Sequence, residues 1–349
     1  MTMPRVSIII VNWNGIKHLP TCLDTLQRQT FRDFETILVD NGSSDGSVEL
    51  LQQSYQWVKL VKLGHNTGFS GGNNEGLKHA SADYIVVLNN DTEAEPSWLA
   101  ELVAAADANP KAGQVGCRIC SMDDHDRIDS LGHGVCPDGM TRGRFRMRRW
   151  SEVGKNFLPV DEMFFGTACV SLYRRAALDQ VGFFDDDMFA IGEDSDLGLR
   201  LRWYGWDAFL ATDAVIYHKY SATSGVFSPF KLYLVERNHY WVAVKNFPLS
   251  MLLLVPFYTL LRYLVQIQVV LSAKGSGGEF AASGSKWPIV RALLQGSWKA
   301  LVGMPLMLAK RRTIVKNARI SSREMRALMK KYRMTFHELL DVGKTGAGR

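Results

Sequence analysis

The segment VVLNNDTEAEP, residues 86–96, ends an apolar β-branched run with three oxygen-bearing side chains, Asn89, Asn90 and Asp91. Magnesium and manganese prefer oxygen ligands, and they often take only one or two protein carboxylates because water and substrate phosphates supply the rest. Asp91 suits such an ion, and the amides of Asn89 and Asn90 suit hydrogen bonds to ribose or phosphate. An ordinary polar strand end leading into a turn is the alternative, which a short motif does not exclude.

Polar residues follow two other apolar runs in the same way, at residues 12–15 and at residues 40–45. Ligands of open parallel sheets bind outside the carboxyl ends of the strands. If the runs are parallel strands, the segments 12–15, 40–45 and 89–91 therefore converge on one crevice. Asn12 and Asn14 then become candidates for contacts to a nucleotide donor in that crevice.

Asp40 and Asp45 belong to the segment DNGSSDGS, whose small residues allow the backbone to approach a flat ligand. A carboxylate at Asp40 can accept the imide N–H of a uracil or thymine ring, so we expect this residue to recognise the base. An Asx turn at the start of the next helix explains Asp45 without any ligand.

The glycine-rich segment HNTGFSGGNNEGL, residues 65–77, does not form a dinucleotide-binding fingerprint. Its glycines do not fit G-x-G-x-x-G, and no acidic residue ends a strand at the expected distance. Glycines at the start of a helix still allow a nucleoside to approach the backbone closely. Asn66, Gly68 and Asn73 are therefore predicted to bind the donor.

The elements that must position these residues alternate between apolar strands and helices. Strands are predicted within 6–15, 34–47, 58–63 and 83–91, and helices within 18–30, 47–56 and about 72–79. Continuous apolar strands, each followed by a helix, indicate a parallel sheet with helices on both faces. With 349 residues, of which 46% are hydrophobic and 22% charged, the chain can bury one large core and a smaller appendage, and disorder is excluded.

The five cysteines are irregularly spaced, and no basic and apolar leader precedes the first strand, which predicts a reducing cytoplasmic compartment. Cys117, Cys120, His133 and Cys136 superficially resemble a zinc spacing, but no second clear pair follows, so buried free thiols are the better interpretation. The basic loop at 142–150 is typical of a solvated face, although beside an acceptor site it could hold a lipid pyrophosphate.

Charge is divided unevenly along the chain. Residues 1–218 carry 20 Lys and Arg against 30 Asp and Glu, net −10, whereas residues 219–349 carry 21 against 5, net +16. An acidic body with a basic tail suggests two tasks, with the tail facing the phosphates of lipid or nucleic acid.

The tail contains two apolar segments, at 249–273 and 287–312, joined by the glycine- and serine-rich segment 274–286, which is predicted to be a flexible linker. The first segment has about the length of a membrane span, but polar residues interrupt it. Three of these share one narrow helical face: Thr259, Arg262 and Gln266. We expect both segments to lie in a lipid interface. Packing on the catalytic domain, or a dimer interface, is the alternative.

Seven blocks in this order resemble the family 2 inverting glycosyltransferases of GT-A fold, and among them the bacterial rhamnosyltransferase-like branch. The blocks are VSIIIVNWNG, ILVDNGSSDGS, NTGFSGGNNEGL, VVLNNDT, FFGTACVSLYRRAAL, VGFFDDDMFAIGEDSDLGLRLRWYGW and AVIYHKYSATSG. The resemblance covers about residues 5–245. It implies a Rossmann-like, mostly parallel sheet in a catalytic domain at 1–245, followed by a basic, membrane-associated helical region at 246–349.

The resemblance also implies a divalent metal, Mn²⁺ or Mg²⁺, on the donor diphosphate. In the family's Asp-x-Asp element the last position holds this metal, which assigns the role to Asp91. Asn89 stands where many members have aspartate, so one anionic contact is missing here. His218 lies where related enzymes supply a histidine ligand, and imidazole is acceptable to manganese.

The segment GEDSDLGLR carries the catalytic assignment. Direct displacement at an anomeric carbon needs a base that takes the proton of the incoming hydroxyl. By resemblance Asp194 is this base, and Glu193 helps to bind the acceptor. The alternative makes both residues helix-capping acids favoured by the macrodipole. Gly166, in an element that borders the donor sugar and acceptor in the family, and Phe189, a possible sugar platform, are the other acceptor-side candidates.

The implied reaction is transfer of a sugar, best rhamnose from dTDP-rhamnose, to a lipid-linked glycan in cell-surface polysaccharide synthesis. The implied location is peripheral, at the cytoplasmic face of the inner membrane, with a homo-oligomer left open and no nucleic acid partner. Another sugar from a UDP or GDP donor, or a noncatalytic sugar-nucleotide-binding scaffold, is the alternative. A nucleotidyltransferase would use Asp91 but would give no role to Glu193 and Asp194.

Overall fold

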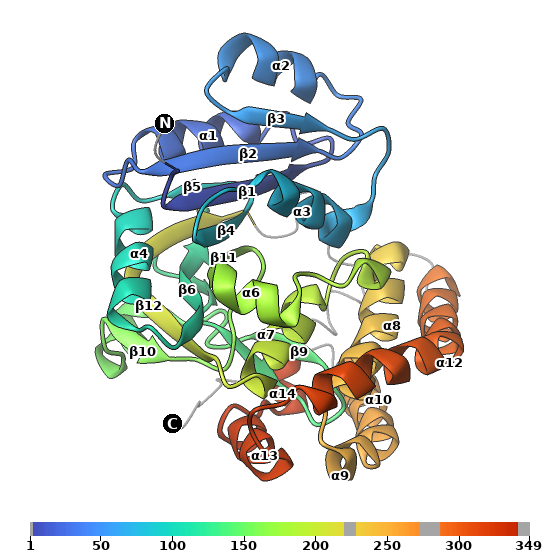
Figure 1. Ribbon diagram of the computed structural model, residues 1–349. Helices are drawn as coiled ribbons and strands as arrows, with labels where there is room; N and C mark the ends of the chain where they lie inside the picture. The colour runs from blue at the N-terminus through green and yellow to red at the C-terminus, as the bar shows by residue number, and fades with distance from the viewer. Residues whose placement is uncertain (1–2, 220–227, 272–286, 341–349) are drawn as a thin grey trace.

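The computed structural model describes residues 3–219, 228–271 and 287–340. A mixed sheet runs through the molecule in the order β10-β12-β6-β11-β4-β1-β2-β3 (Figure 1). In chain order its strands are β1 (Val6–Asn12), β2 (Phe34–Asp40), β3 (Lys59–Lys62), β4 (Tyr84–Asn89), β6 (Ala112–Ser121), β10 (Val160–Glu162), β11 (Val170–Arg174) and β12 (Asp207–His218). The first four strands are parallel to one another, as predicted, whereas β11 is antiparallel to both β4 and β6.

Shorter strands extend the sheet around its carboxyl edge. β5 (Thr92–Ala94) pairs with β12, and β7 (Ile128–Ser130) pairs with β6. A separate two-stranded sheet consists of β8 (His133–Val135) and β9 (Thr141–Gly143). β7, β8 and β9 follow β6 in the chain, and β7 brings Asp129 next to His218 at the end of β12.

Helices cover both faces of the sheet. Up to the end of β12 they are α1 (Leu19–Gln27), α2 (Ser47–Ser54), α3 (Gly68–His79), α4 (Trp98–Ala108), α5 (Trp150–Val153), α6 (Arg175–Val181) and α7 (Glu193–Trp203), with 3₁₀ turns η1 (Gly154–Asn156) and η2 (Asp186–Met188). Alternate residues of β1 face opposite layers because side chains alternate along a strand. Ile8 and Ile10 belong to the core formed with α1 and α4, and Ile9 to the core formed with α6 and α7.

Helix α3 begins at Gly68, four residues before the position predicted from sequence. The side chain of Asn41, at the end of β2, holds this start in place. Its oxygen accepts the amide of Thr67 at 2.9 Å, and its nitrogen donates to the carbonyl of Gly68 at 2.9 Å. A local pattern could not reveal a cap supplied by a residue so far away in sequence.

Gly72 and Gly76 of α3 serve helix–sheet packing. A Cβ at Gly72 would lie 2.7 Å from a methyl of Val11, and one at Gly76 would lie 2.4 Å from a methyl of Ile9. These two glycines are therefore required by packing, and donor binding at Asn66, Gly68 and Asn73 stays a prediction.

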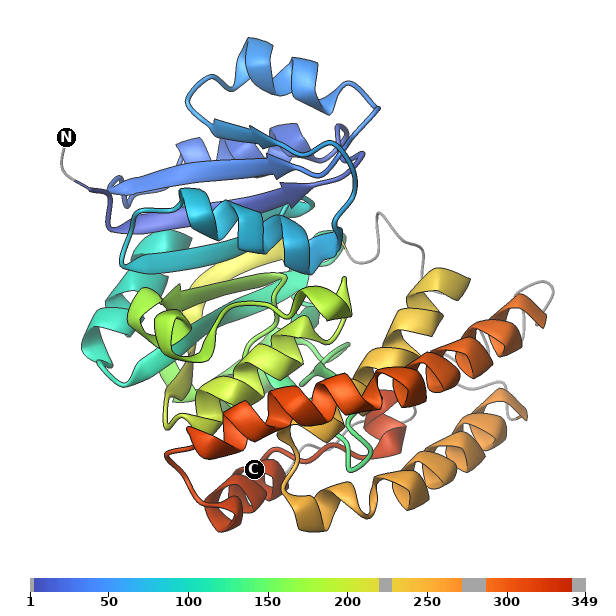
Figure 2. The same cartoon turned by 45° about the vertical axis from the view of Figure 1, so that its right-hand side comes forward.

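Beyond β12 the chain is helical, at the end of the molecule opposite α2 and β3 (Figure 2). The helices are α8 (Pro229–Asn246), α9 (Leu249–Leu252), α10 (Val255–Leu271), α12 (Trp287–Lys316), α13 (Ser322–Lys331) and α14 (Phe336–Leu339). Helix α12 packs closely on α8, where a Cβ at Gly296 would lie 2.8 Å from the carbonyl oxygen of Tyr233. The inner face of α12 therefore packs on the body, as the alternative interpretation predicted.

The polar stripe predicted on the first tail segment faces inward. Arg262 is buried and donates to Asp138 at 2.6 Å and to Glu236 at 3.2 Å, which ties α10 to α8 and to the turn after β8. Because its charge is matched by two buried carboxylates, it is a structural tie and does not face a lipid phosphate.

None of the helices in the described parts of the chain is both long enough and apolar enough to cross a membrane. The predicted linker at 274–286 lies outside the described residues, as do residues 220–227, which include part of the last block of the family resemblance. The predicted boundary at residue 245 falls one residue before the end of α8.

Candidate functional site

The carboxyl ends of β1, β2 and β4 converge, as predicted, through side-chain hydrogen bonds. The buried amide of Asn12 donates to Asp40 at 3.3 Å and accepts from Asn90 at 2.7 Å. Asp40 also accepts the backbone amide of Ser43 at 3.1 Å. Each carboxylate oxygen of Asp40 can accept a further bond, so its proposed contact with a base is compatible with these partners.

Asp91 and His218 meet where β4 and β12 end. One oxygen of Asp91 is buried without a hydrogen-bond partner in the described structure, and it lies 3.4 Å from Nε2 of His218. The other ring nitrogen of His218, Nδ1, lies 2.8 Å from the carboxylate of Asp129. Burial opposes charge on His218, but the thiol of Cys169 and the carboxylates of Asp129 and Asp91 outweigh it and raise the pKa of the imidazole well above its usual value.

These groups fit a divalent cation that takes few protein ligands. Within the described residues no three His, Cys, Asp or Glu side chains are grouped to hold a metal. Manganese and magnesium do not need such a cage when phosphates and water complete their coordination. The unpartnered oxygen of Asp91, the adjacent His218 and the carboxylate of Asp129 behind the imidazole match the usual arrangement in which a second carboxylate orients a histidine ligand.

Glu193 and Asp194 open helix α7, whose N-cap is Gly192 in a left-handed conformation at φ 91°. Asp194 accepts the amide of Ser195 at 2.6 Å and that of Ala168 at 3.3 Å, and Nδ1 of His133 lies 3.7 Å from its carboxylate. Neither acid occupies the N-cap position, but both lie in the first turn, where the macrodipole favours them as the alternative interpretation predicted.

Glu193 differs sharply from its neighbour. Its Oε2 is buried without a hydrogen-bond partner among the described residues. Burial, followed by the charge of Asp194, raises the pKa of Glu193 to about 8. Glu193 therefore keeps its proton at neutral pH, which makes it a hydrogen-bond donor rather than a base.

Two short segments connect the surroundings of Asp91 with those of Asp194. In the first, Asp129 contacts His218, and His133, four residues later, approaches Asp194. Four residues of extended chain span at most about 14 Å. In the second, the amide of Ala168 donates to Asp194, and the carbonyl of its neighbour Cys169 accepts the amide of Asn89 at 2.9 Å. The ends of β4 and β12 and the start of α7 therefore border the same region.

The other predicted donor residues have mixed surroundings. Asn66 is engaged within the protein, because its side-chain oxygen accepts from Asn41 at 3.1 Å and from the amide of Gly68 at 2.8 Å. Asn73 donates to the carbonyl of Phe69 but has a buried oxygen without a partner in the described structure. Asn14, at φ 52°, accepts the amide of Ser44 at 2.8 Å. Asp45 accepts the amide of Ser47, which confirms the predicted Asx turn.

The acceptor-side candidates, Phe189 and Gly166, lie at constrained backbone positions. Phe189 is in a left-handed conformation at φ 64°, its ring centroid lies 5.8 Å from that of Phe230, and its carbonyl accepts the amide of Ser70. The amide of Gly166 donates to Gln114 at 3.0 Å, and a Cβ there would lie 2.6 Å from Oγ of Ser171. Gly166 is thus required by packing, whatever its part in binding.

Asp129 and His133 were not predicted as site residues. They lie in DRIDSLGHG, where His133 was considered only as part of a zinc spacing. The cysteines of that spacing are buried free thiols, as predicted, and burial raises the pKa of Cys120 to about 11. An aspartate and a histidine within two strands of three residues each are the only local signal for this part of the site.

Several arginines of the basic loop 142–150 form ion pairs and hydrogen bonds within the protein, which a fully solvated loop would not do. Arg146 pairs with Asp129, Arg149 pairs with Asp126, and Arg142 donates to the carbonyl of Leu339. The loop therefore supports the segment that carries Asp129.

Comparison with solved structures shows the fold. The chain resembles the crystal structure of S. aureus TarS 1-349, with a TM-score of 0.53 at 16% identity, over 94% of this chain and 91% of that one. It also resembles GalNAc-T7 crystallised with UDP, GalNAc and Mn²⁺, with a TM-score of 0.55 at 14% identity, over 70% of this chain and 48% of that one. The predicted α/β GT-A fold is confirmed.

Comparison of sequences shows the family. An O-antigen biosynthesis protein, RfbC, of Myxococcus xanthus is 33% identical over 236 residues, which are 63% of this chain but only 18% of that protein. An N-acetylglucosaminyl-diphospho-decaprenol L-rhamnosyltransferase of Mycobacterium tuberculosis is 29% identical over 241 residues, 62% of this chain and 76% of that protein. The profile of Glycosyl transferase family 2 matches residues 7–182, about half of the chain. The chain belongs to glycosyl transferase family 2.

Proposed function

We propose that this protein transfers a sugar from a nucleoside diphosphate sugar to a hydroxyl of a lipid-linked glycan, with inversion at the anomeric carbon. Rhamnose from dTDP-rhamnose is the favoured donor, because the rhamnosyltransferase relative is similar over 76% of its own length. That relative's name also motivates the acceptor class, a sugar on a prenyl diphosphate. The observation that carries the proposal is the link from His218 through Asp129 and His133 to Asp194.

Each group has a defined task in such a transfer. A divalent metal held by Asp91 and His218 would supply positive charge to the diphosphate leaving group. Asp194 takes the proton of the acceptor hydroxyl while the oxygen of that hydroxyl bonds to the anomeric carbon. The bond between the anomeric carbon and the diphosphate breaks, and its electrons leave with the diphosphate. The protonated Glu193 donates a hydrogen bond to the acceptor, which would satisfy its unpartnered oxygen.

Transfer assays with matched variants test the proposal. The donors are dTDP-rhamnose and a panel of UDP and GDP sugars with Mn²⁺ or Mg²⁺, and the acceptor is N-acetylglucosamine on a short prenyl diphosphate. Asp194→Asn should lower the transfer rate by about 10²–10⁴-fold while donor binding, measured calorimetrically, stays within twofold. Asp179→Asn, which removes an exposed carboxylate on α6, is the control. Retained transfer in D194N, or a product with retained configuration, would contradict the assignment.

We further propose that the enzyme works peripherally at the cytoplasmic face of the inner membrane. The outer faces of α9, α10 and α12 expose large apolar side chains, among them Leu249, Phe257, Leu260, Leu264, Leu294, Trp298 and Leu301. No acidic residue lies in these three helices, and Arg291, Lys299, Arg312 and Lys316 are exposed along α12. Apolar faces flanked by cations suit the interface of an anionic bilayer, where each nearby cation contributes about 1 kcal/mol.

A further inference from the structure

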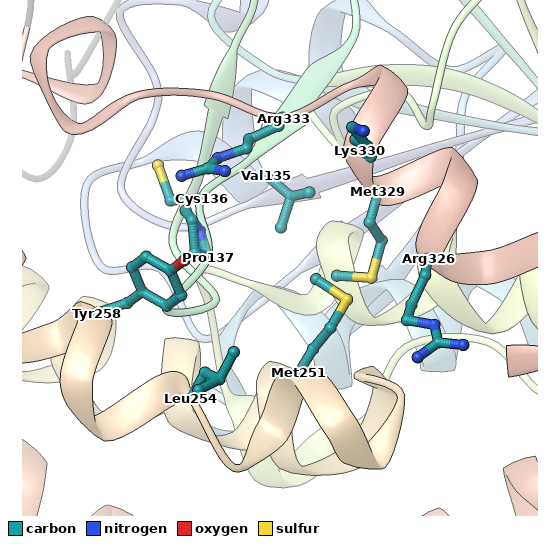
Figure 3. A pocket seen from close by; sticks show the side chains of 10 residues that line it. All are labelled: Val135, Cys136, Pro137, Met251, Leu254, Tyr258, Arg326, Met329, Lys330 and Arg333. Carbon is teal, nitrogen blue, oxygen red and sulfur yellow. The ribbon is translucent and has the colours of Figure 1, made fainter. Parts of the chain in front are cut away.

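An apolar groove lies between α9–α10 and α13, outside the region of Asp91 and Asp194 (Figure 3). Its cavity has a volume of about 190 Å³, and Met251 and Met329 point toward one another across it. A second cavity of about 270 Å³ continues it, since both are lined by Pro137, Tyr258 and Arg333. Flexible methionine side chains adapt readily to an irregular hydrocarbon partner.

Three cations border this apolar lining, namely Arg326, Lys330 and Arg333. No acidic side chain lines either cavity, and none of the three forms an ion pair with another described residue. Arg326 donates one hydrogen bond to Ser250 at 3.0 Å, which leaves most of its N–H groups for another acceptor. The groove thus combines a hydrocarbon-lined interior with positive charge that is not neutralised inside the protein.

The inner end of the groove is connected to the candidate base. Val135 lines the groove and ends β8, two residues after His133, whose Nδ1 lies 3.7 Å from Asp194. Backbone hydrogen bonds with residues on both sides of Arg333 hold Val135 in place: its amide donates to Tyr332 and its carbonyl accepts from Met334. The same short strand therefore contributes to the groove and to the surroundings of Asp194.

The outer end of the groove is continuous with the exposed apolar face of α10. Leu254 and Leu261 line the two cavities, yet 50% and 39% of their surfaces are exposed. Leu254 and Leu261 therefore belong both to the groove and to the exposed apolar surface of this helical region.

We propose that this groove binds the prenyl chain and the diphosphate of the lipid-linked acceptor, with the chain against Met251, Leu254 and Met329 and the diphosphate on Arg326, Lys330 and Arg333. The inference rests on the proposed function for the identity of the lipid. It adds a binding site that the chemistry at Asp194 does not require, because a sugar hydroxyl could reach the base without any contact to its carrier.

Binding of farnesyl diphosphate to the full chain, in detergent-free buffer without any donor sugar, tests the inference by calorimetry. Inorganic pyrophosphate provides the anion without the chain, and farnesol provides the chain without the anion. Farnesyl diphosphate should bind at least tenfold more tightly than either. The variants Arg326→Gln/Arg333→Gln and Leu254→Asp should each weaken it by at least about tenfold, because a charge-assisted contact is lost or a repulsive carboxylate is introduced.

Matched controls show whether a loss of farnesyl diphosphate binding comes from the groove, from the exposed apolar face or from the net charge of the protein. Arg323→Gln removes an exposed cation of the same helix that does not line the groove, and Leu264→Asp places a carboxylate on the apolar face outside it. Neither should change farnesyl diphosphate binding by more than twofold. All altered side chains are exposed, and melting temperatures verify folding.

Equal binding of pyrophosphate and farnesyl diphosphate would overturn the inference, and so would unchanged binding in both groove variants or equal losses in the controls. Transfer activity does not enter this experiment. If no donor sugar is ever transferred but the groove variants lose farnesyl diphosphate, the proposed function fails while the lipid diphosphate site stands.

Discussion

Several buried polar atoms around the candidate site have no hydrogen-bond partner among the described residues. They include Oδ1 of Asp91, Oε2 of Glu193, Nδ1 of His133 and Oδ1 of Asn73. A buried unsatisfied polar group costs about 1–3 kcal/mol, and folded proteins contain few of them. Three of these four belong to the region between β4, β8 and α7, where a bound ligand would supply the missing partners.

Glu193 gives a prediction at the scale of one residue. Its pKa is raised to about 8 by burial and then by Asp194, from an ordinary value of 4.5. Between these values the unfolded chain has released a proton that the folded protein keeps, so folding stability falls as pH rises through this window and levels off above about pH 8. In Glu193→Gln this loss is absent.

The difference in melting temperature between Glu193→Gln and the unmodified protein should therefore grow from pH 5 to pH 8 by roughly 2 °C or more. Scanning calorimetry at several pH values measures it. Glu49→Gln, on the exposed side of α2, controls for loss of a surface carboxylate. A difference that stays constant over this range would show that Glu193 ionises as readily in the folded protein as in the unfolded chain.

At the scale of elements, Arg262 decides how α10 is attached. It is buried between Asp138 and Glu236, and Glu236 also accepts from Oγ of Ser297 at 3.2 Å, so one carboxylate ties α8 to both α10 and α12. Replacing Arg262 by methionine keeps much of its volume but leaves two buried carboxylates uncompensated. Such a change destabilises a protein by about 3–5 kcal/mol.

Urea unfolding of Arg262→Met measures this loss. Arg291→Met, an exposed arginine of α12, should change the free energy of unfolding by no more than about 0.5 kcal/mol. The triple variant R262M/D138N/E236Q removes all three charges and should be more stable than R262M alone. If R262M and R291M behave alike, the ion cluster does not hold α10 to the body.

Some helices and strands could be predicted from local sequence patterns, and others could not. The strands β1, β2 and β4 and the convergence of their ends were predictable, because long apolar runs carry a strong local signal. The start of α3 was not, since it depends on Asn41. The strands β7 and β8 have only three residues each, too few for periodicity, so the positions of Asp129 and His133 were hidden. The inward direction of Arg262 depends on Asp138, 124 positions away.

At the scale of the whole molecule, the uneven charge along the chain corresponds to a division in space. The acidic part forms the sheet with its covering helices, and the basic part forms the helical end seen in Figure 2. Composition predicted two tasks, but not that α12 would pack its inner face on α8 while exposing apolar side chains on the outside. That dual use required the tertiary structure.

Vesicle sedimentation tests the membrane face. Binding to vesicles with anionic lipid should exceed binding to zwitterionic vesicles and should fall as salt is raised, because exposed charges are screened. Leu294→Asp/Trp298→Asp should reduce partitioning by at least about tenfold, since two large apolar side chains are lost from the contact. Leu158→Asp alters an exposed leucine outside these helices and should have no effect. Equal partitioning of both variants would contradict the proposed face.

The position of Mn²⁺ in crystals grown with a nucleoside diphosphate decides whether the proposed site exists. We expect an anomalous peak bonded to the Asp91 carboxylate and to Nε2 of His218, with the diphosphate on the same ion and the Asp194 carboxylate facing it across the space of one sugar. A peak bonded to other residues, or a diphosphate and an Asp194 carboxylate that open onto separate surfaces, would contradict it.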